Sequence, residues 1–447
     1  MINYLRPYNQ YKESGQAWLG QVPSHWKILP NRAIFSQIVD RGHKDEQLLS
    51  VTILRGVIQQ SSLLEDTSKK DGSNLNKSAY KLVCSGDIAY NKMRAWQGAI
   101  GISRYRGLVS PAYVVIRLRD QENQPEFFHY LYRTANFAKE AERWSYGITS
   151  DMWSLRPEHF RMIYTVCPPP QEQLDIIRFL NWSNARIEKA IRAKKKLIRL
   201  LDEQKQAIIH RAITRGIDPT IRVKSSGVAW IGEIPDHWEA KRLKWVTMLQ
   251  RGYDLPADKR IQGEFPVISS GGVIDTHAQA RAKGPGVVLG RYGSAEAVFY
   301  VESDFWPHNT SLFVKDFHGN IPKWCYFLLR VIPKGDQTSK SAVPGVDRKD
   351  LFDIVVPLPP IEEQRAVVDF IERATARLNS LTAHFEHEIT LLLEYRVRLI
   401  ADVVTGKLDV REVASHLPAE TLPFGESIEN DDLINDVEIQ KGADETE

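Results

Sequence analysis

Two long stretches without Gly or Pro constrain the fold of this chain more than any other feature. The first covers residues 171 to about 214, and the second covers residues 361–405. In both, apolar residues recur at alternating steps of three and four, which predicts two long amphipathic helices. At about 1.5 Å per residue, the first helix would be roughly 65 Å long. A narrow apolar stripe on so long a helix favours a partner helix over a globular core.

We expect the two helices to pair as an antiparallel coiled coil, because a folded segment of the chain separates them. The predicted stripe of the first helix comprises Ile177, Leu180, Ile187, Ile191, Ile198 and Leu201. That of the second helix comprises Ile371, Leu378, Phe385, Leu392 and Leu399. Polar residues interrupt the stripes at Asn184, Lys194, Lys205 and Glu388. Two unrelated core helices are the alternative, but a globular core requires no such length.

The helices belong to a repeat that includes more of the chain. Their entries, PPPQEQ and LPPIEEQ, place Gln173 and Gln364 at an offset of 191 residues, which also relates Phe179 to Phe370. A leader is repeated as well, because residues 14–26 (SGQAWLGQVPSHW) and 226–238 (SGVAWIGEIPDHW) are identical at eight positions. A repeat that keeps its register over a whole helix indicates duplication of a unit and predicts pseudo-twofold symmetry.

The leaders are rich in Gly, Pro and aromatic residues, so we expect extended segments punctuated by turns. Trp18 and Trp26, and their counterparts in the second leader, are the predicted packing anchors. His25 and His237 could be read as catalytic. No nucleophile or carboxylate accompanies either one in the sequence, and a histidine hydrogen-bonded beside a buried tryptophan explains them better.

Between each leader and its helix lies a body that alternates short apolar segments with turns. Strands are predicted at 48–54, 79–83, 87–91, 99–103 and 113–118 in the first body, and at 265–269, 286–290, 297–301 and 311–315 in the second. A helix is expected after Pro125 and another after Pro322. The expected fold class is α+β, with two mixed α/β bodies joined and separated by the two long helices.

The expected domain boundaries follow from this order. They are 1–168 for the first leader and body, 169–216 for the first helix, 217–358 for the second leader and body, 359–408 for the second helix, and 409–447 for an acidic, unstructured tail. The bodies have diverged almost completely, whereas the leaders and helices remain alike. A duplicated frame that carries different inserts suggests one scaffold presenting two specificities.

The composition limits the classes of function that this chain can have. The net charge of +3 hides an asymmetry, because residues 426–447 carry nine acidic residues and one lysine, which leaves +11 on the remainder. A basic body is compatible with a polyanionic partner such as nucleic acid. Three scattered cysteines, no apolar signal core and no apolar run of membrane-spanning length predict a cytoplasmic protein.

The sequence offers no convincing catalytic or metal site. It contains no GxxxxGK[ST] loop, no HExxH motif and no paired Cys/His spacing. The run from Asp202 to Lys205 resembles a nuclease pattern, but it lies within the first long helix and reads as a solvated face. We therefore expect no catalytic residues and no metal in this chain, and predict a binding protein instead of an enzyme.

Basic, aromatic and small polar residues near predicted turns are the candidate DNA contacts, because such side chains bind phosphates and base edges. Taken singly, each cation is better explained as an ordinary solvated surface residue. As a set they favour DNA binding: Lys92, Arg94, Trp96, Arg104, Tyr105, Arg106, Tyr146, Thr149, Arg291, Tyr292, Ser339, Lys340 and Arg348.

The layout resembles the specificity (S) subunits of type I restriction-modification systems across almost the whole chain. The resemblance rests on the SGxxWxGxxPxHW leaders, the turns at Gly86 and Gly286, the two helix entries and the long helices in this order. It implies that each body is a target-recognition domain, and that the paired helices are a spacer on which two modification (methyltransferase) subunits and restriction subunits dock. S-adenosylmethionine, ATP and magnesium would then belong to the partners.

Two unlike bodies held at a fixed separation are expected to read an asymmetric, bipartite site on double-stranded DNA. The alternative is a stand-alone, sequence-specific nucleic-acid-binding scaffold that has no methyltransferase partners. Co-purification with a methyltransferase subunit would distinguish the two.

Overall fold

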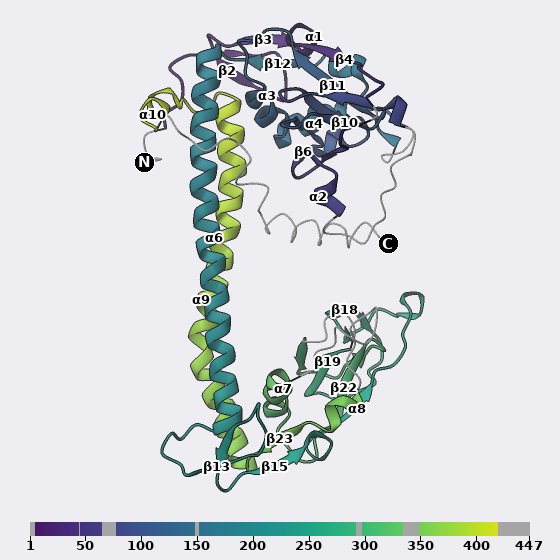
Figure 1. Ribbon diagram of the computed structural model, residues 1–447, viewed down its shortest axis with the longest axis vertical. Helices are drawn as coiled ribbons and strands as arrows, with labels where there is room; N and C mark the ends of the chain where they lie inside the picture. The colour runs from purple at the N-terminus through teal and green to yellow at the C-terminus, as the bar shows by residue number, and fades with distance from the viewer. Residues whose placement is uncertain are drawn as a thin grey trace. The chain divides into compact units, whose positions relative to one another are not determined.

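The computed structural model describes residues 5–43, 45–64, 77–147, 152–291, 297–333 and 348–418. The chain forms two compact units (Figure 1). Unit 1 comprises Met1–Ala193 and Glu388–Glu447, and unit 2 comprises Lys194–His387. Each unit contains helices and sheets, which confirms the expected mixture of α and β structure. Each unit also contains part of both long helices, so the compact units do not follow the five predicted segments.

The main sheet of unit 1 is antiparallel throughout. Its strands, in spatial order, are β4 (Phe35–Ile38), β11 (Tyr113–Leu118), β8 (Ile88–Asn91) and β9 (Ile100–Ile102). Two further antiparallel pairs belong to unit 1: β5 (Leu49–Thr52) with β6 (Gly56–Gln59), which form a hairpin, and β7 (Lys81–Val83) with β10 (Gly107–Val109), which are not consecutive in the chain. The five strands predicted for this body are all present, whereas the edge strand β4 was not predicted from its short, mixed sequence.

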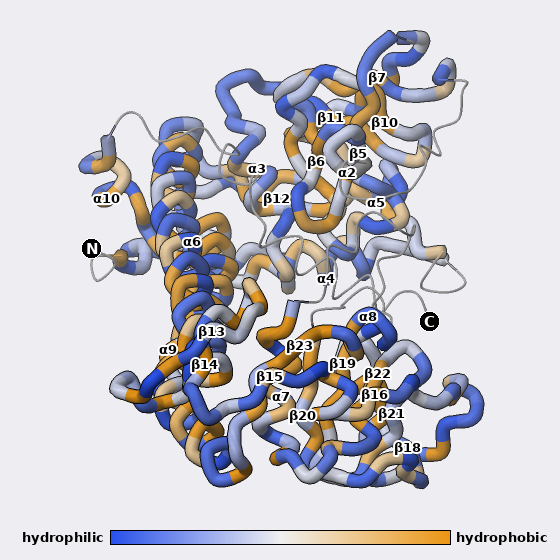
Figure 2. Tube along the Cα trace, turned by 60° about the horizontal axis from the view of Figure 1, so that its bottom comes forward, coloured by the Kyte–Doolittle hydropathy of each residue, from blue (hydrophilic) through white to orange (hydrophobic). Residues whose placement is uncertain are grey.

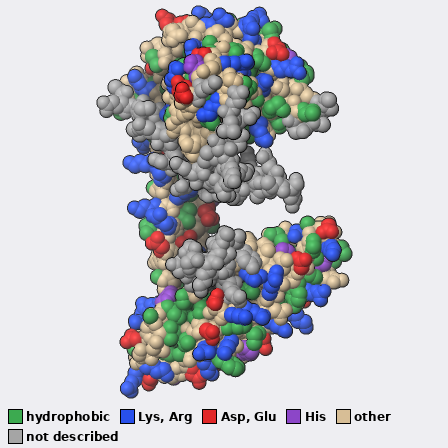
Figure 3. Space-filling model, turned by 45° about the vertical axis from the view of Figure 1, so that its right-hand side comes forward, with side chains coloured by type: hydrophobic (Ala, Val, Ile, Leu, Met, Phe, Trp, Pro, Cys, Tyr) green, Lys and Arg blue, Asp and Glu red, His purple; other side chains and the backbone are tan. Residues whose placement is uncertain are grey.

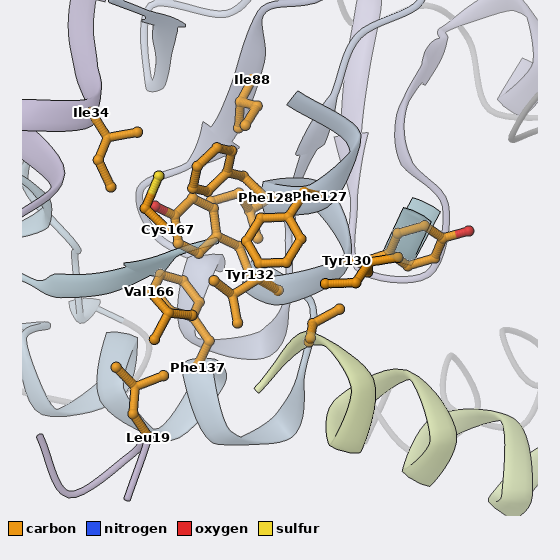
Figure 4. Packing of buried hydrophobic residues seen from close by; sticks show 14 of the residues in the cluster. Leu19, Ile34, Ile88, Phe127, Phe128, Tyr130, Tyr132, Phe137, Val166 and Cys167 are labelled. Atoms are coloured by element: carbon orange, nitrogen blue, oxygen red, sulfur yellow. The ribbon is translucent and has the colours of Figure 1, made fainter. Parts of the chain in front are cut away.

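Two helices cover the core of unit 1. They are α3 (Pro125–Tyr132), which begins with a proline as predicted, and α4 (Ala135–Arg143), whose N-cap Thr134 accepts a hydrogen bond from the Phe137 N–H at 3.3 Å. Phe127, Phe128 and Tyr132 on α3 are fully buried. Figure 4 shows these rings pointing toward one another beside Phe137, and their burial explains why this aromatic segment folds as a helix against the sheet.

The main sheet of unit 2 has the same strand order as that of unit 1. It runs β16 (Met248–Arg251), β22 (Ser311–Asp316), β19 (Gly286–Gly290) and β20 (Val298–Val301), again antiparallel. Unit 2 also contains a three-stranded sheet, with the strand order β18 (Gly272–His277), β17 (Phe265–Ser269) and β21 (Trp306–Pro307). Its helices include α7 (Pro322–Val331) and α8 (Arg348–Phe352). The bodies therefore share a topology that their sequences barely show.

The leaders are extended, as predicted, and each forms a small antiparallel pair. These pairs are β1 (Tyr11–Glu13) with β2 (Gln21–Pro23), and β13 (Val223–Ser225) with β14 (Glu233–Pro235). The next strand of each repeat, β3 (Lys27–Pro30) or β15 (Glu239–Arg242), pairs with the strand that precedes a long helix, β12 (Tyr164–Cys167) or β23 (Val355–Leu358). Trp26 and Trp238 are fully buried, which confirms them as anchors.

The long helices are α6 (Pro170–Arg215) and α9 (Ile361–Val404). In unit 1, Ile187 and Ile191 of α6 pack against a group from the later part of α9 that includes Leu392. In unit 2, the end of α6, at Ile213, shares a core with the start of α9, at Ile371. Within each unit the helices thus pack with opposite chain directions, and Figure 2 shows apolar and polar residues alternating along both.

The predicted stripe is buried in part. Leu180, Ile187, Ile191, Ile371 and Leu399 are buried, whereas the other stripe residues are only half-buried: Ile177, Ile198, Leu201, Leu378, Phe385 and Leu392. Two polar interruptions are accommodated by local contacts. The Lys194 Nζ lies 5.3 Å from the centre of the Phe385 ring, and the Lys205 Nζ donates to the Asn379 side chain at 3.2 Å. The apolar contact between these two helices is therefore less continuous than the predicted stripe.

The predicted start of the tail at residue 409 is wrong for its first ten residues. Residues 409–418 include the short helix α10 (Arg411–Ser415), and Val410 and Ala414 are fully buried in the core of unit 1. The backbone N–H of Asp409 donates to the carbonyl of Arg6 at 2.8 Å, which joins this segment to the residues that precede the first leader. Apolar spacing in VREVASHL, outside the acidic stretch, provides the packing. The remaining acidic tail lies outside the described residues.

Short helical turns complete the described fold. They are α1 (Asn31–Ile34), α2 (Ser61–Leu64), α5 (Pro157–Phe160), η2 (Lys77–Ala79), η3 (Ala95–Gln97), η5 (Leu243–Trp245) and η6 (Ala257–Lys259). None of the helices in the described ranges combines the length and apolarity that crossing a membrane requires.

Candidate nucleic-acid interface

A repeated Glu-Gln pair at the start of each long helix joins that helix to its leader. The carboxylate of Glu172 accepts hydrogen bonds from the Trp26 indole at 3.0 Å and the Tyr8 hydroxyl at 2.6 Å, and it lies 2.8 Å from His25 Nε2. Burial and the Glu172 carboxylate raise the pKa of Tyr8. His237 makes the same contact with Glu363 at 2.6 Å, so both histidines are hydrogen-bonded beside a buried tryptophan, as expected. The expectation that no carboxylate accompanies them is wrong, because their partners are glutamates 147 and 126 residues further along the chain.

The glutamine of each pair joins the long helix to the body. The side-chain oxygen of Gln173 accepts the backbone N–H of Gln124 at 2.8 Å, and its nitrogen donates to Asn123 at 2.7 Å. Gln364 makes the same contacts with the N–H of Ile321, at 3.0 Å, and with Asn320, at 2.7 Å. These loops precede α3 and α7, so the Glu-Gln pairs orient both bodies on their helices in the same way. We call Glu172, Gln173, Glu363 and Gln364 the clamp residues.

Three candidate DNA contacts of unit 1 lie in the loop that follows β8. Lys92 is half-buried, Arg94 is exposed, and Trp96 sits in η3, where its indole donates to the Met93 carbonyl at 2.9 Å. The loop places a cation and an aromatic edge at one end of the main sheet. This combination can contact a phosphate and stack on a base or sugar.

A half-buried arginine supports the base of this loop. Arg133, which follows α3, donates to the carbonyls of Gly98 at 3.2 Å and Ile100 at 3.1 Å, and its other nitrogen donates to that of Ile53 at 2.9 Å. Burial of its guanidinium lowers the pKa of Arg133 to about 10. It remains charged at neutral pH and is used within the fold, so it is not a candidate for contact with DNA. No feature of the sequence separates Arg133 from the surface cations.

Tyr146 joins the same surface through its neighbours. It forms an isolated β-bridge with Ser154, and the next residue, Leu155, donates its N–H to the Lys92 carbonyl at 2.9 Å. The Trp153 ring packs edge-on against Trp96 at 5.5 Å between centroids. Tyr146 itself is 58% exposed. We call Lys92, Arg94, Trp96 and Tyr146 the unit 1 loop surface. Thr149 lies outside the described residues.

The remaining candidates of unit 1 lie elsewhere. Arg104, Tyr105 and Arg106 follow β9, which runs antiparallel to β8, so they lie at the opposite end of the sheet from Lys92. The Arg106 guanidinium donates to Glu46 at 2.7 Å, and this hydrogen bond raises the pKa of Arg106. Tyr105 packs against a core cluster that includes residues of the strand pairs β5–β6 and β7–β10, and Arg104 is half-buried. The structure therefore does not unite the two groups in one surface.

In unit 2, Arg291 occupies the position that matches Lys92. It directly follows β19, the counterpart of β8 in the strand order, and its N–H donates to the carbonyl of Thr310 at 3.2 Å. The side chains of Thr310 and His308 lie 3.1 Å apart, and Arg251 donates to the Asn309 carbonyl at 3.2 Å. Burial lowers the pKa of His308. Tyr292 lies outside the described residues.

The polar loop at His308, Asn309 and Thr310 was missed by the sequence reasoning. A polar triplet directly after the apolar Trp306–Pro307 strand is a turn signal that could have identified it. Arg348 is exposed at the start of α8, whose Leu351 is buried in the core of unit 2. Ser339 and Lys340 lie outside the described residues. We call Arg251, Arg291, Asn309 and Thr310 the unit 2 loop surface.

Charge alone does not delimit an interface. Figure 3 shows Lys and Arg side chains over the visible face of both units, with Asp and Glu side chains interspersed. Across the described ranges, no three His, Cys, Asp or Glu side chains gather in a way that could hold a metal ion. The loop surfaces are therefore defined by their position in the two equivalent sheets.

Comparisons with known proteins point to one family. A family model for the type I restriction modification DNA specificity domain matches residues 235–391. The putative type I restriction enzyme MjaX specificity subunit of Methanocaldococcus jannaschii is 21% identical over 446 residues, which cover 90% of this chain and 98% of that protein. The EcoBI specificity subunit of Escherichia coli is 31% identical over 71 residues, which cover 16% of this chain and 15% of that protein.

A solved structure supports the fold. It is described as the structural basis underlying complex assembly and conformational transition of the type I R-M system, and it matches 86% of this chain and 98% of its own. The identity is 14% and the TM-score 0.61. These comparisons confirm the resemblance that the leaders and helix entries indicate.

Proposed function

We propose that this chain, which carries a type I restriction-modification DNA specificity domain, reads an asymmetric bipartite site on double-stranded DNA with one half-site for each body. The observation that carries the proposal is the pair of equivalent sheets with unlike loops. β8 and β19 hold the same place in the strand order, but the loops that follow them share no sequence. Equal topology with different loops suits equivalent approaches to two different base sequences.

The helices suit the role of a spacer between the half-sites. α6 has 46 residues, so at about 1.5 Å per residue it spans roughly 69 Å, or at most about 20 base pairs at about 3.4 Å each. Packing of the bodies against the helices shortens this limit. Half-site centres about one helical turn apart, near 34 Å, would let both bodies approach one face of the duplex.

The chemistry belongs to partner subunits in this proposal. Two methyltransferase subunits, and restriction subunits where present, would dock on the paired helices. They would bring S-adenosylmethionine, ATP and magnesium, and the complex would act in the cytoplasm. The chain itself contributes recognition and no catalytic residue. The clamp residues support this division, because their polar groups are used to orient the bodies.

Mapping of methylated bases in the source genome tests the proposal. We expect methylated adenines at a split, asymmetric motif, loss of this methylation when the chain is deleted, and its return on complementation. Methylation that persists without the chain would contradict the proposal. Co-purification is a second readout, because a chain that binds DNA specifically without any methyltransferase subunit would be the stand-alone scaffold instead.

Insertion of one heptad into both long helices tests the spacer. Seven residues restore the orientation of the helical seam, so the bodies should keep their half-sites while the unread gap lengthens. Insertion at equivalent depths of α6 and α9 keeps the pairing intact. Altered half-site sequences, or an unchanged gap, would show that the helices do not set the spacing.

A further inference from the structure

A groove in unit 2, lined by apolar and charged side chains, has a counterpart in unit 1 that is covered. The groove has a volume of about 410 Å³, and Ile208, Ala212, Ile217 and Phe370 provide its apolar lining. Two of these side chains are unusually accessible for their size, since Ile217 is 43% exposed and Phe370 is 38% exposed. We call these four residues the unit 2 groove.

The internal repeat gives the matching surface in unit 1. The offset of 191 residues relates Phe370 to Phe179 and Ile208 to Leu399. Phe179 is 1% exposed and Leu399 is 4% exposed. Phe370 is therefore exposed where the identical Phe179 is buried, and Ile208 is half-buried where Leu399 is buried.

The C-terminal segment of the described chain belongs to the core cluster in which these positions of unit 1 are buried. Val410 and Ala414 are fully buried in the core cluster that contains Phe179 and Leu399, and Leu417 packs against the same cluster. Figures 1 and 2 both show α10 beside α6 in unit 1. Val410, Ala414 and Leu417 recur at steps of four and three, which is the pattern of a short amphipathic helix laid against an apolar surface.

The segments that follow the two long helices begin with the same kind of turn and then differ. After α9, the Asp409 side chain accepts the N–H of Arg411 at 3.1 Å, and after α6, the Asp218 side chain accepts the N–H of Thr220 at 2.8 Å. Beyond this turn, the chain of unit 1 forms α10, whereas that of unit 2 continues into β13. The repeat therefore has a covering helix at one of its two equivalent surfaces.

We propose that the unit 2 groove binds a short amphipathic helix of a partner protein, with aliphatic side chains spaced like Val410, Ala414 and Leu417. We infer this occupant from α10, because α10 is the segment that packs at the equivalent surface of unit 1. Arg211, at the edge of the groove, replaces Asp402 of unit 1, so an acidic residue on the facing edge of the helix would add to binding. A second copy is not favoured, because its α10 is part of its own core.

The probe is a fluorescent peptide of residues 410–418, added to the full-length chain and followed by anisotropy. We expect saturable binding with a Kd below about 1 mM, and at least about tenfold weaker binding to Phe370→Asp and Ile217→Asp. Val397→Asp is the matched control, because Val397 is an equally apolar, 58% exposed residue of α9 in unit 1. Circular dichroism confirms that each variant is folded.

Two outcomes would overturn the proposal. One is the absence of saturable binding to the wild-type chain, and the other is equal binding to the wild type and both groove variants. Light scattering adds a third, since conversion of a wild-type dimer to a monomer by Phe370→Asp would assign the groove to a second copy. DNA binding by the same variants should be unchanged, so failure here is distinguishable from failure of the proposed recognition function.

Discussion

Trp26 and Glu172, which are 146 residues apart in the chain, are hydrogen-bonded at 3.0 Å, and the equivalent pair of Trp238 and Glu363 is hydrogen-bonded at 2.8 Å. The geometry is repeated but the environment is not. The side chain of Glu172 is 5% exposed, whereas that of Glu363 is 40% exposed. Glu172 also accepts the Tyr8 hydroxyl. The same contact therefore contributes differently to the stability of the two units.

We expect Glu172→Ala to lower the free energy of unfolding by about 2–4 kcal/mol, because it leaves buried donors of Trp26 and Tyr8 without an acceptor. The matched change, Glu363→Ala, should cost only about 0.5–1.5 kcal/mol, because water can replace its exposed carboxylate. Urea denaturation of both variants followed by tryptophan fluorescence measures the difference. Equal losses would show that burial does not control the strength of the clamp.

The glycines that end the long helices form a second matched pair. Gly406 and Gly216 both have left-handed backbones, with φ of 79° and 73°. A Cβ at Gly406 would lie 2.3 Å from Pro23, whereas one at Gly216 would approach Trp238 only to 3.2 Å. Backbone strain should lower the free energy of unfolding of both Ala variants by about 1 kcal/mol. The clash with Pro23 should lower that of Gly406→Ala by about 1–3 kcal/mol more. Thermal unfolding of the two variants tests this order.

His129 predicts a pH dependence for unit 1. Burial, with a smaller effect of Arg133 and Arg104, lowers its pKa well below the usual value, while its Nδ1 accepts the N–H of Ile102 at 3.2 Å. The unfolded chain therefore binds a proton below about pH 6.5 that the folded chain does not, so stability is present above that pH and is lost below it.

We expect His129→Gln, which keeps a hydrogen-bond acceptor, to reduce the loss of unfolding free energy between pH 6.5 and 5.5 by up to about 1 kcal/mol. Urea denaturation at both pH values measures the difference between wild type and variant. If the two proteins lose the same stability on acidification, His129 does not carry the effect.

The loop surfaces can be tested by comparing their cations with a cation that is hydrogen-bonded within the protein. Lys92→Ala and Arg94→Ala should weaken DNA binding and reduce the slope of its salt dependence by about one each if they contact phosphates. Arg291→Ala should weaken contacts to the other half-site only. Arg106→Ala is the control, because its guanidinium is hydrogen-bonded to Glu46 at the far end of the sheet. An equal effect of Arg106→Ala would remove the support for a localised surface.

The three cysteines differ in accessibility. Burial raises the pKa of Cys167 to about 11 and also raises that of Cys325, so their thiolate populations at neutral pH are small. Cys84 is half-buried. We expect a thiol reagent to modify Cys84 first in the native protein, and Cys84→Ser to remove this fast phase. Rapid reaction of all three thiols under native conditions would contradict the described core.

The sequence predicted the elements that depend on local pattern. Both long helices, the leaders and the predicted strands of both bodies are present because their apolar spacing and turn residues agree with the fold. The boundary at residue 409 failed because the acidic composition further along the chain hid the apolar spacing of Val410, Ala414 and Leu417. The burial of Ile209 and Ile213, which lie outside the predicted stripe, also follows from tertiary contacts alone.

The candidate interface was predictable only in part. Lys92, Arg94, Trp96 and Tyr146 come together because residues 152–155 contact the loop after β8, and the sequence contains no signal for that contact. Arg104 and Arg106 looked equivalent to them, but the antiparallel pairing of β8 and β9 sends them to the other end of the sheet. Arg133 shows the same limit, since its burial is visible only in the fold.

The division of the chain has a consequence for its synthesis on the ribosome. Unit 2 is one continuous segment, Lys194–His387, whereas unit 1 requires both Met1–Ala193 and the last part of the chain. Leu399, Val403 and Val410 complete the core around Phe179. The nascent chain therefore exposes that apolar surface until the residues of unit 1 that follow His387 have been translated, so the part of unit 1 before Lys194 reaches its final packing only after all of unit 2 has been made.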